Sequence, residues 1–337
     1  MKLSDICKYR NEKINLKDIN ENEYVSTDNM LPNFAGLGEL KSFPNVDRVS
    51  KFCRNDILLS NIRPYFKKMI LSDNNSGCSS DVLVIETINK DVNSKFLYYR
   101  LRLDDFFDYV ILTSKGTKMP RGDKKAIMNF ELEVPKLDIQ NKIVKIIENI
   151  DKKIELNNKI NNNLYKISKQ LLLKYLDENK SSDEINISKF LNIFTGKKNA
   201  NETSPTGKYK FFSCAPESLL SDTYLCDSAA IIVAGNGAYT GRTRFYDGKF
   251  ELYQRTYGLT LKDGFEKNNI YGLYVFMKTI FEPDKMGGTH GSAIPYIVLS
   301  DLTDYKLKYN KVEFDRFSNL VSGNIKMIQE NEKSNEK

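Results

Sequence analysis

The most regular pattern of apolar and polar residues lies in the middle of the chain, after Pro135. Apolar side chains recur there every three or four positions, the spacing of one face of an α-helix, and no Pro or Gly interrupts them. The apolar positions are Ile139, Ile143, Ile146, Ile150, Ile154, Leu164, Ile167, Leu171 and Tyr175. A helix from residue 138 to about residue 178 would be about 60 Å long, which is too long to be stable without a partner. The pattern therefore predicts a long helix that packs in a coiled coil.

A polar segment interrupts the apolar stripe of this helix at residues 157–163. Asn157 and Asn161 occupy positions that the apolar seam would use. A buried Asn in a coiled coil fixes register and partner choice at the expense of stability. A polar, solvated turn of helix is the alternative interpretation, and the sequence favours neither.

The segments on either side of the predicted helix resemble each other. Gly-Thr-Lys-Met-Pro at residues 116–120 returns 175 positions later as Gly-Ser-Ala-Ile-Pro at residues 291–295. A strand-like run at residues 56–60 returns at residues 230–234, an offset of 174. Each segment mixes short apolar runs with one or two helical patterns, so we expect two similar α+β domains.

A second helical stripe follows the second domain, with Phe314, Phe317, Val321, Ile325 and Ile328 on one face. The predicted layout is a first domain over residues 1–137, a central spacer helix over 138–180, a second domain over 181–310 and a shorter C-terminal helix over 311–337.

Composition narrows the class of protein. The chain carries 51 Lys and Arg against 44 Asp and Glu, a net charge of +7, which is compatible with nucleic-acid binding without demonstrating it. No apolar stretch is long enough to span a bilayer, so we expect no membrane partner. The N-terminus lacks an apolar signal segment, and the five cysteines are scattered, which together indicate the reduced cytoplasm.

The chain has few residues suited to catalysis or metal binding. It has one histidine, His290, and no pair of cysteines at C-x-x-C spacing, so we expect no metal site. The glycines of residues 235–241 lack the third position of a dinucleotide-binding loop. Residues 61–66 match an amino-methyltransferase signature at only two of four positions. We therefore expect no catalytic residue and interpret the chain as a binding or scaffolding protein.

Two sets of motifs resemble a known family. Residues 134–143 (Val-Pro-Lys-Leu-Asp-Ile-Gln-Asn-Lys-Ile) lead into residues 150–157, and in the second domain residues 237–242 are followed by residues 253–257 (Tyr-Gln-Arg-Thr-Tyr). In this order the motifs resemble the specificity subunit of type I restriction-modification systems, with two target recognition domains.

The resemblance implies a fold and a function. It implies two α+β target recognition domains that each read one part of a split site in double-stranded DNA, separated by long helices that form an antiparallel coiled coil. Two methyltransferase (modification) subunits would methylate adenine with S-adenosylmethionine, and motor/nuclease restriction subunits would use ATP with Mg. This chain would choose the sequence, bind no cofactor itself and carry out no chemistry.

Candidate DNA contacts follow from the loops that carry basic, amide and hydroxyl side chains. In the first domain they are Arg63, Tyr65, Lys67, Lys115, Lys118 and Arg121. In the second domain they are Asn236, Tyr239, Thr240, Arg242, Gln254, Arg255, His290 and Ser292. The Gly-Thr of residues 116–117 and the Gly-Ser of residues 291–292 have an alternative interpretation as turns that the fold requires.

The spacer is expected to dock other subunits. Its residues are Ile139, Ile143, Ile146, Ile150, Ile154, Asn157, Asn161, Leu164, Leu171, Phe317 and Val321. Because the C-terminal helix is shorter, we expect the seam of Leu164, Ile167, Leu171 and Tyr175 to lack a partner within the chain. A second copy, a separate fragment or the modification subunits would cover it. An alternative function follows, in which a truncated or orphan specificity subunit acts only as a protein-interaction module.

Overall fold

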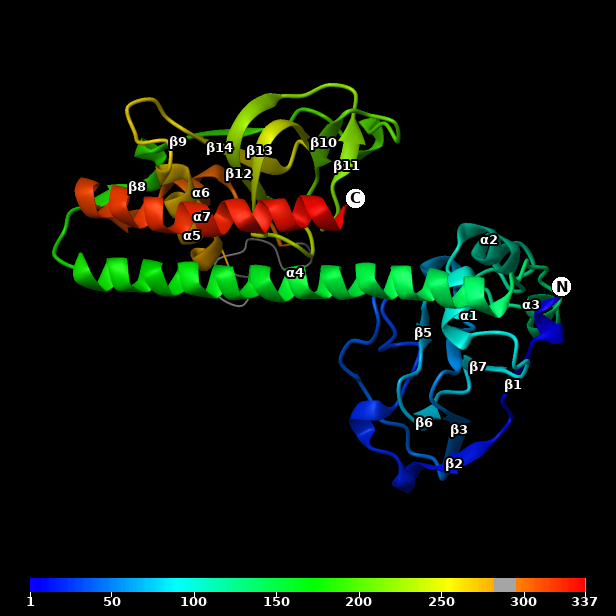
Figure 1. The fold of residues 1–337 in the computed structure, drawn as a ribbon. Coiled ribbons are helices and arrows are strands. Elements are labelled where there is room, and N and C mark those ends of the chain that lie inside the picture. Colours follow the sequence, from blue (N-terminus) through cyan, green and yellow to red (C-terminus); the bar gives the residue numbers. More distant parts are fainter. Residues whose placement is uncertain (282–294, 337) are drawn as a thin grey trace. The chain divides into compact units, whose positions relative to one another are not determined.

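The computed structural model describes residues 1–281 and 295–336. The chain divides into two compact units, Met1–Asp151 and Lys152–Lys337. Helix α4, Leu137–Glu178, begins in the first unit and ends in the second, and its bounds agree with the predicted long helix (Figure 1). No helix in the described ranges is both long and apolar enough to cross a membrane.

The first unit combines two small sheets with short helices. A four-stranded antiparallel sheet has the order β1-β7-β4-β5, and a three-stranded sheet has the order β2-β3-β6. The strands are β1 Cys7–Tyr9, β2 Lys13–Asn15, β3 Arg48–Phe52, β4 Ile57–Ser60, β5 Met69–Leu71, β6 Ser76–Cys78 and β7 Val82–Thr87. The helices are η1 Leu3–Asp5, η2 Leu16–Asp18, η3 Glu21–Glu23, η4 Pro64–Phe66, α1 Ser94–Arg100, α2 Asp104–Leu112 and α3 Lys124–Met128. Phe106 and Phe107 of α2 are fully buried in the core next to the four-stranded sheet, so α2 covers the apolar side of that sheet.

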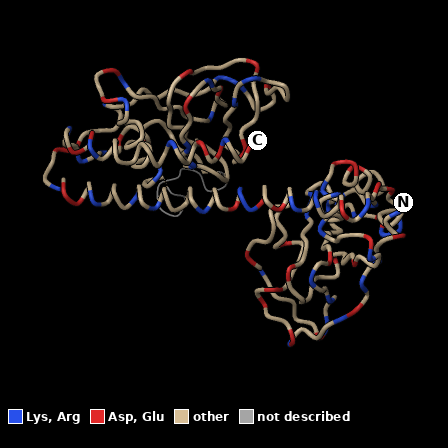
Figure 2. The backbone as a smooth tube through the Cα atoms, viewed as in Figure 1, with Lys and Arg blue, Asp and Glu red and all other residues tan. Residues whose placement is uncertain are grey.

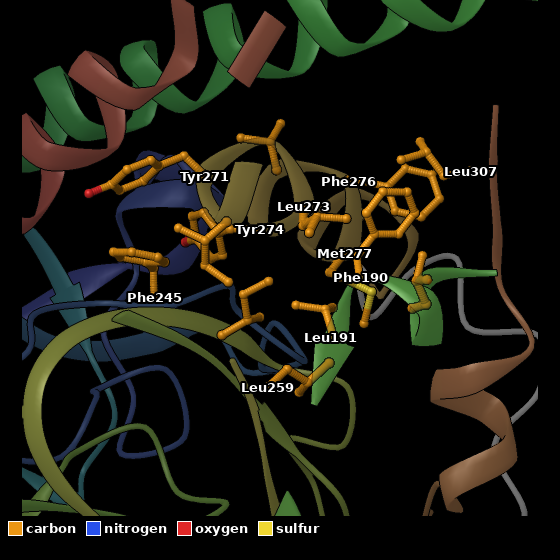
Figure 3. Packing of buried hydrophobic residues seen from close by; sticks show 14 of the residues in the cluster. Phe190, Leu191, Phe245, Leu259, Tyr271, Leu273, Tyr274, Phe276, Met277 and Leu307 are labelled. Atoms are coloured by element: carbon orange, nitrogen blue, oxygen red, sulfur yellow. The ribbon is translucent and has the colours of Figure 1, made fainter. Parts of the chain in front are cut away.

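The second unit is built on a six-stranded sheet with the order β11-β10-β13-β12-β14-β9. Its strands are β8 Glu184–Asn186, β9 Leu191–Thr195, β10 Tyr209–Phe212, β11 Leu219–Ser221, β12 Cys226–Ala234, β13 Thr243–Leu252, β14 Thr256–Leu261 and β15 Lys306–Lys308. Its helices are η5 Ile187–Lys189, η6 Ala200–Glu202, α5 Asn269–Ile280, α6 Leu299–Thr303 and α7 Lys311–Asn335. Nearly all residues of helix α5 are buried. On the side that faces the sheet, Leu273, Tyr274 and Met277 pack over Leu191 and Leu259 (Figure 3).

The two units contain the same sheet. The strand order β1-β7-β4-β5 corresponds to β9-β14-β12-β13, with antiparallel pairing throughout. The pair Ile57↔Ile85 becomes Ile231↔Leu259, so both positions move by 174 residues. The register thus confirms the internal repeat, and the mixture of helices and sheets confirms two similar α+β domains.

The C-terminal part of α4 packs antiparallel against α7 within the second unit. Residue numbers rise along one helix as they fall along the other. The paired residues are Asn157 and Asn335, Asn161 and Asn331, Ser168 and Asn324, and Tyr175 and Phe317. They advance by four or seven residues at each step, the repeat of a coiled coil. Asn157 is only 8% exposed and bonds Asn335 at 2.8 Å, which favours the interpretation as a register-fixing polar pair.

The prediction of an uncovered seam at the end of α4 is wrong. Because the helices are antiparallel, the start of α7 packs against the end of α4. Tyr175 is 4% exposed and stacks on Phe317, and Leu164 and Leu171 pack against the core. Of the four residues named, Ile167 alone is exposed.

The other exposed isoleucines of α4 lie in its N-terminal part. Ile146 is 61% exposed and Ile150 is 52% exposed, and Ile139 is also exposed. The described hydrogen bonds between α4 and α7 reach Asn157 and Asn158 and go no nearer to the beginning of α4. The beginning of α4 therefore carries exposed apolar side chains.

Candidate functional site

The turn between β4 and β5, residues 61–68 (turn 1), contains two residues with left-handed backbone. Arg63 has φ 49° and Lys67 has φ 50°, a region that L-residues rarely adopt. The turn is held from outside, because the Arg63 N–H donates to the Pro120 carbonyl at 2.8 Å. The ring of Tyr65 at the top of the turn is 47% exposed. Turn 1 therefore presents an arginine and an aromatic ring to solvent.

A second loop of the first unit, residues 115–121, lies beside turn 1. It is closed at its base by two backbone hydrogen bonds of 2.8 Å between Lys115 and Arg121. The Arg121 Nη1 donates to Asp81 Oδ1 at 2.7 Å, and both side chains remain open to solvent. Lys118 is exposed in the loop. The first unit thus brings together the loops that carry Arg63, Lys118 and Arg121, three of the predicted DNA contacts.

Gly116 supports the structural interpretation of the Gly-Thr pair in this loop. Its φ of 94° is a conformation that favours glycine, so the turn itself requires this residue. The matching pair at residues 291–292, with the candidate contacts His290 and Ser292, lies outside the described residues.

Two predicted contact lysines form ion pairs within the first unit. Lys67 pairs with Asp104, and Lys115 pairs with Asp123. The pKa of Asp123 is lowered to about 2. The main cause is the hydrogen bond from the Lys115 ammonium, and two backbone N–H groups at the start of α3 add to it. Exposed ion pairs of this kind are weak and exchange readily, so both lysines can still meet an anionic ligand.

The turn between β12 and β13, residues 235–242 (turn 2), is the counterpart in the second unit. Gly237 has φ 85° and Gly241 has φ 82°. The Gly237 N–H donates to the Pro295 carbonyl at 2.9 Å. The ring of Tyr239 is 47% exposed, as in turn 1.

Thr240 does not face solvent as a base contact would. Its side chain is buried, and its hydroxyl lies within hydrogen-bond distance of the Gly237 carbonyl at 2.7 Å and the Pro295 carbonyl at 2.8 Å. The hydroxyl therefore closes turn 2, and the predicted DNA contact is corrected to a structural role.

Turn 2 ends in two neighbouring arginines. The Arg242 guanidinium lies 5.3 Å from the Tyr239 ring centroid, and one of its terminal nitrogens is buried with no hydrogen-bond partner in the described part of the chain. Arg244 donates to the carbonyls of Ala215 and Pro216. Burial and then the charge of Arg242 lower the pKa of Arg244. Two close, partly desolvated cations favour binding of an anion such as a phosphate group.

The remaining contact candidates of the second unit have mixed surroundings. Asn236 accepts a hydrogen bond from the Cys214 thiol at 3.1 Å, a contact that no feature of the sequence indicated. Gln254 donates to Asn199 at 2.9 Å. Arg255 is exposed and has no side-chain partner among the described residues. The second unit therefore also displays basic and amide groups around its turn.

The loops of the two units are fastened by matching backbone interactions. The matching pairs are Ser60 N–H to Lys68 O and Ala234 N–H to Arg242 O; Asn61 N–H to Asp81 O and Gly235 N–H to Arg255 O; Arg63 N–H to Pro120 O and Gly237 N–H to Pro295 O; and the bridges Ile62↔Arg121 and Asn236↔Tyr296. Each pair is related by an offset of 174 or 175. The candidate contact residues therefore occupy equivalent places in the two units.

A buried glutamine anchors the start of α4 to the first unit. Gln140 is fully buried; its amide accepts from the Asn93 N–H at 2.8 Å and donates to the carbonyls of Asp91 and Pro135. Such a saturated polar side chain fixes the helix in one position. Gln140 lies within the motif of residues 134–143, and its sequence context predicted no role for it.

No group of three or more His, Cys, Asp or Glu side chains in the described ranges could hold a metal ion. Cys7 and Cys78 are buried, and burial raises the pKa of each thiol to about 12.

Basic and acidic residues are interspersed along the backbone of both units (Figure 2). The basic residues of the two turns are therefore small groups within a chain of mixed charge.

Comparison with known proteins gives consistent results. Residues 1–166 match the family described as "Type I restriction modification DNA specificity domain". The chain is 32% identical over 123 residues to the type I restriction enzyme EcoDI specificity subunit of Escherichia coli, a match that covers 36% of this chain and 26% of that protein. It is 29% identical over 156 residues to the HindI specificity subunit of Haemophilus influenzae, covering 44% and 34%. The chain thus matches only about a third of the length of these relatives.

A solved structure resembles the whole chain. The S subunit of a type I restriction-modification system from M. genitalium superposes with a TM-score of 0.61 at 15% identity, covering 100% of this chain and 91% of that one. At this identity the likeness concerns the fold, which is that of two similar domains joined by long helices. Residues 1–166 thus belong to the type I restriction modification DNA specificity domain family, and the chain as a whole has the fold of that S subunit.

Proposed function

We propose that this chain is the DNA sequence-recognition subunit of a type I restriction-modification complex and reads a split, asymmetric site in double-stranded DNA. The observation that carries the proposal is the duplicated loop set. Each unit presents an exposed tyrosine and nearby cations from a turn fastened by the same backbone hydrogen bonds. Two similar readers with different side chains suit a site made of two different halves.

The long helix supplies the spacing between the half-sites in this proposal. A helix of 42 residues is about 63 Å long, close to two turns of B-form DNA at 34–36 Å each. The polar pair of Asn157 and Asn335 fixes the middle of α4 in register with α7, and the buried Gln140 fixes the start of α4 to the first unit. Inserting one helical turn within residues 157–163 should change the gap between the half-sites without changing either half-site.

The chemistry belongs to other subunits in this proposal. Two modification subunits would dock along the helices and methylate adenine with S-adenosylmethionine, and motor/nuclease subunits would use ATP with Mg. The exposed isoleucines of α4, such as Ile146 and Ile150, are the apolar surface available for docking. The chain itself would bind no cofactor and would act in the cytoplasm, where the host DNA lies.

A map of methylated adenine in the host, with the gene present and deleted, tests this function. Loss of methylation at one split motif on deletion is the expected result. An unchanged map would contradict the proposal.

A second candidate function is an interaction module without DNA-directed activity. The observation that favours it is the exposed apolar surface at the beginning of α4, with Ile146 and Ile150, which can bind another protein. Such a module would still co-purify with modification subunits, whereas no methylated motif would depend on it.

A further inference from the structure

Because the two units are repeats, they can be compared position by position. What the comparison implies for DNA recognition rests on the proposed function. A residue that is alike in both units serves what all DNA shares, namely the phosphate backbone and the shape of the groove. A residue that differs in chemistry at an equivalent, exposed position can distinguish one base sequence from another. The matching backbone hydrogen bonds identify which positions of the two units are equivalent, without any use of side-chain similarity.

The turns carry the residues that are alike. Tyr65 and Tyr239 are equivalent, and both rings are half exposed. Lys68 and Arg242 are equivalent cations, and each lies over an aromatic ring of its turn, at 5.8 Å from Phe66 and 5.3 Å from Tyr239. Shared cations beside exposed rings fit contacts with the sugar-phosphate backbone.

The residues immediately before β7 and β14 differ between the units. Asp81 and Arg255 are equivalent, because their carbonyls accept the same hydrogen bond from Asn61 and Gly235 at 2.8 Å and 2.9 Å. One unit thus has an acidic group where the other has a basic group. This reversal is unsuited to a common phosphate contact, since a carboxylate repels phosphate.

Asp81 orients an arginine of its own unit. Its carboxylate accepts from one terminal nitrogen of Arg121 at 2.7 Å, and no other side-chain partner of Arg121 is present in the described part of the first unit. The remaining N–H groups of the guanidinium are therefore available as a planar fork. Such a fork matches the O6 and N7 acceptors of guanine in the major groove.

We propose that Arg121, oriented by Asp81, reads a guanine of the first half-site, and that Arg255 is the base-reading arginine of the second half-site. Tyr65, Lys68, Tyr239 and Arg242 then hold the DNA backbone in both halves. Arg121 and Arg255 then determine which DNA sequence is bound, and the residues of turns 1 and 2 supply the affinity for DNA.

The test uses the full-length chain, purified with the subunits that accompany it in its host, and a pool of randomised duplexes from which bound sequences are read. The variants are Arg121→Lys and Arg255→Lys, which keep the charge but remove the fork. Each should lower discrimination at one G·C pair, in one half-site only, by roughly 10- to 100-fold. Asp81→Asn should relax the same base pair as Arg121→Lys, with an unchanged salt dependence of binding.

Three controls separate base reading from folding and from phosphate binding. The half-site of the unmutated unit remains enriched in each variant and reports on folding. Arg54→Lys alters an exposed arginine at the other end of β4 and should change neither half-site. Lys68→Ala should weaken binding to all sequences and reduce the log–log salt slope by about 1.

The outcomes are distinct. If the wild-type protein enriches no split motif, the proposed function and this inference both fail. If the wild-type motif is present and Arg121→Lys leaves every base preference intact, the inference fails while the proposed function stands. Uniform weakening by Arg121→Lys across all sequences, with no change in any base preference, would identify Arg121 as a phosphate contact and would also overturn the inference.

Discussion

Turn 1 and turn 2 follow the same backbone path with different residues. Turn 1 places Arg63 and Lys67 at left-handed positions, where turn 2 has Gly237 and Gly241. An L-residue in this region costs on the order of 1 kcal/mol or more, whereas glycine adopts it freely. The first unit therefore keeps two cationic side chains at strained positions, and the second unit has an unstrained turn without them. The comparison indicates that the fold requires the path of the turn, while its side chains are free to serve binding.

The largest effect is expected where the turns differ in available space. A methyl group on Gly235 would lie 2.4 Å from the Arg255 carbonyl oxygen, so β14 would have to move. Gly235→Ala should lower the free energy of unfolding by about 1–3 kcal/mol, measured by urea denaturation of the full chain. It should also reduce binding to the second half-site, because Arg255 moves with the strand. An unaltered midpoint would mean that the strand end is pliable.

The strain of turn 1 predicts an opposite change in stability and binding. Arg63→Gly should raise the free energy of unfolding by about 1 kcal/mol, because glycine removes the left-handed strain. It should weaken DNA binding in the same protein, since a cation facing the ligand is lost. Arg54→Gly is the control at an ordinary backbone position and should lower stability by about 0.5–1 kcal/mol. Equal losses in both variants would argue against strain in turn 1.

The reverse experiment introduces the strain into turn 2. A methyl group on Gly237 meets no atom within 4 Å, so only the backbone conformation at φ 85° opposes Gly237→Ala. We expect a loss of about 1 kcal/mol in the free energy of unfolding. Gly323→Ala in α7 is matched, because its methyl group also has open space but its backbone is helical, and it should gain about 0.5–1 kcal/mol. A common sign for the two variants would contradict the conformational explanation.

Much of this architecture could be predicted from the sequence, and the reason is periodicity. The stripe after Pro135 predicted α4 to within a residue at its start, and the offsets of 174 and 175 predicted the repeated sheet. These features depend on spacing along the chain, which a sequence displays directly.

The surroundings of individual side chains could not be predicted in the same way. The expected bare seam near Tyr175 was wrong because antiparallel pairing brings the start of the shorter helix to the end of the long one, where Phe317 covers Tyr175. The role of Gln140 depends on acceptors near Asp91 and Pro135, and the closing role of Thr240 depends on the Pro295 carbonyl. Such contacts depend on residues brought together by folding.

The smallest effect is expected at Asn61, the counterpart of Gly235. Its side-chain oxygen is buried and has no hydrogen-bond partner in the described structure, although the Asn61 backbone makes the same contact as that of Gly235. A buried, unpaired acceptor is unfavourable, and its removal offsets the packing that the amide provides. Asn61→Ala should therefore change the free energy of unfolding by less than about 0.5 kcal/mol. A loss of several kcal/mol would mean that the amide is bonded in solution, and the first unit would then depend on a polar contact that the glycine of the second unit does without.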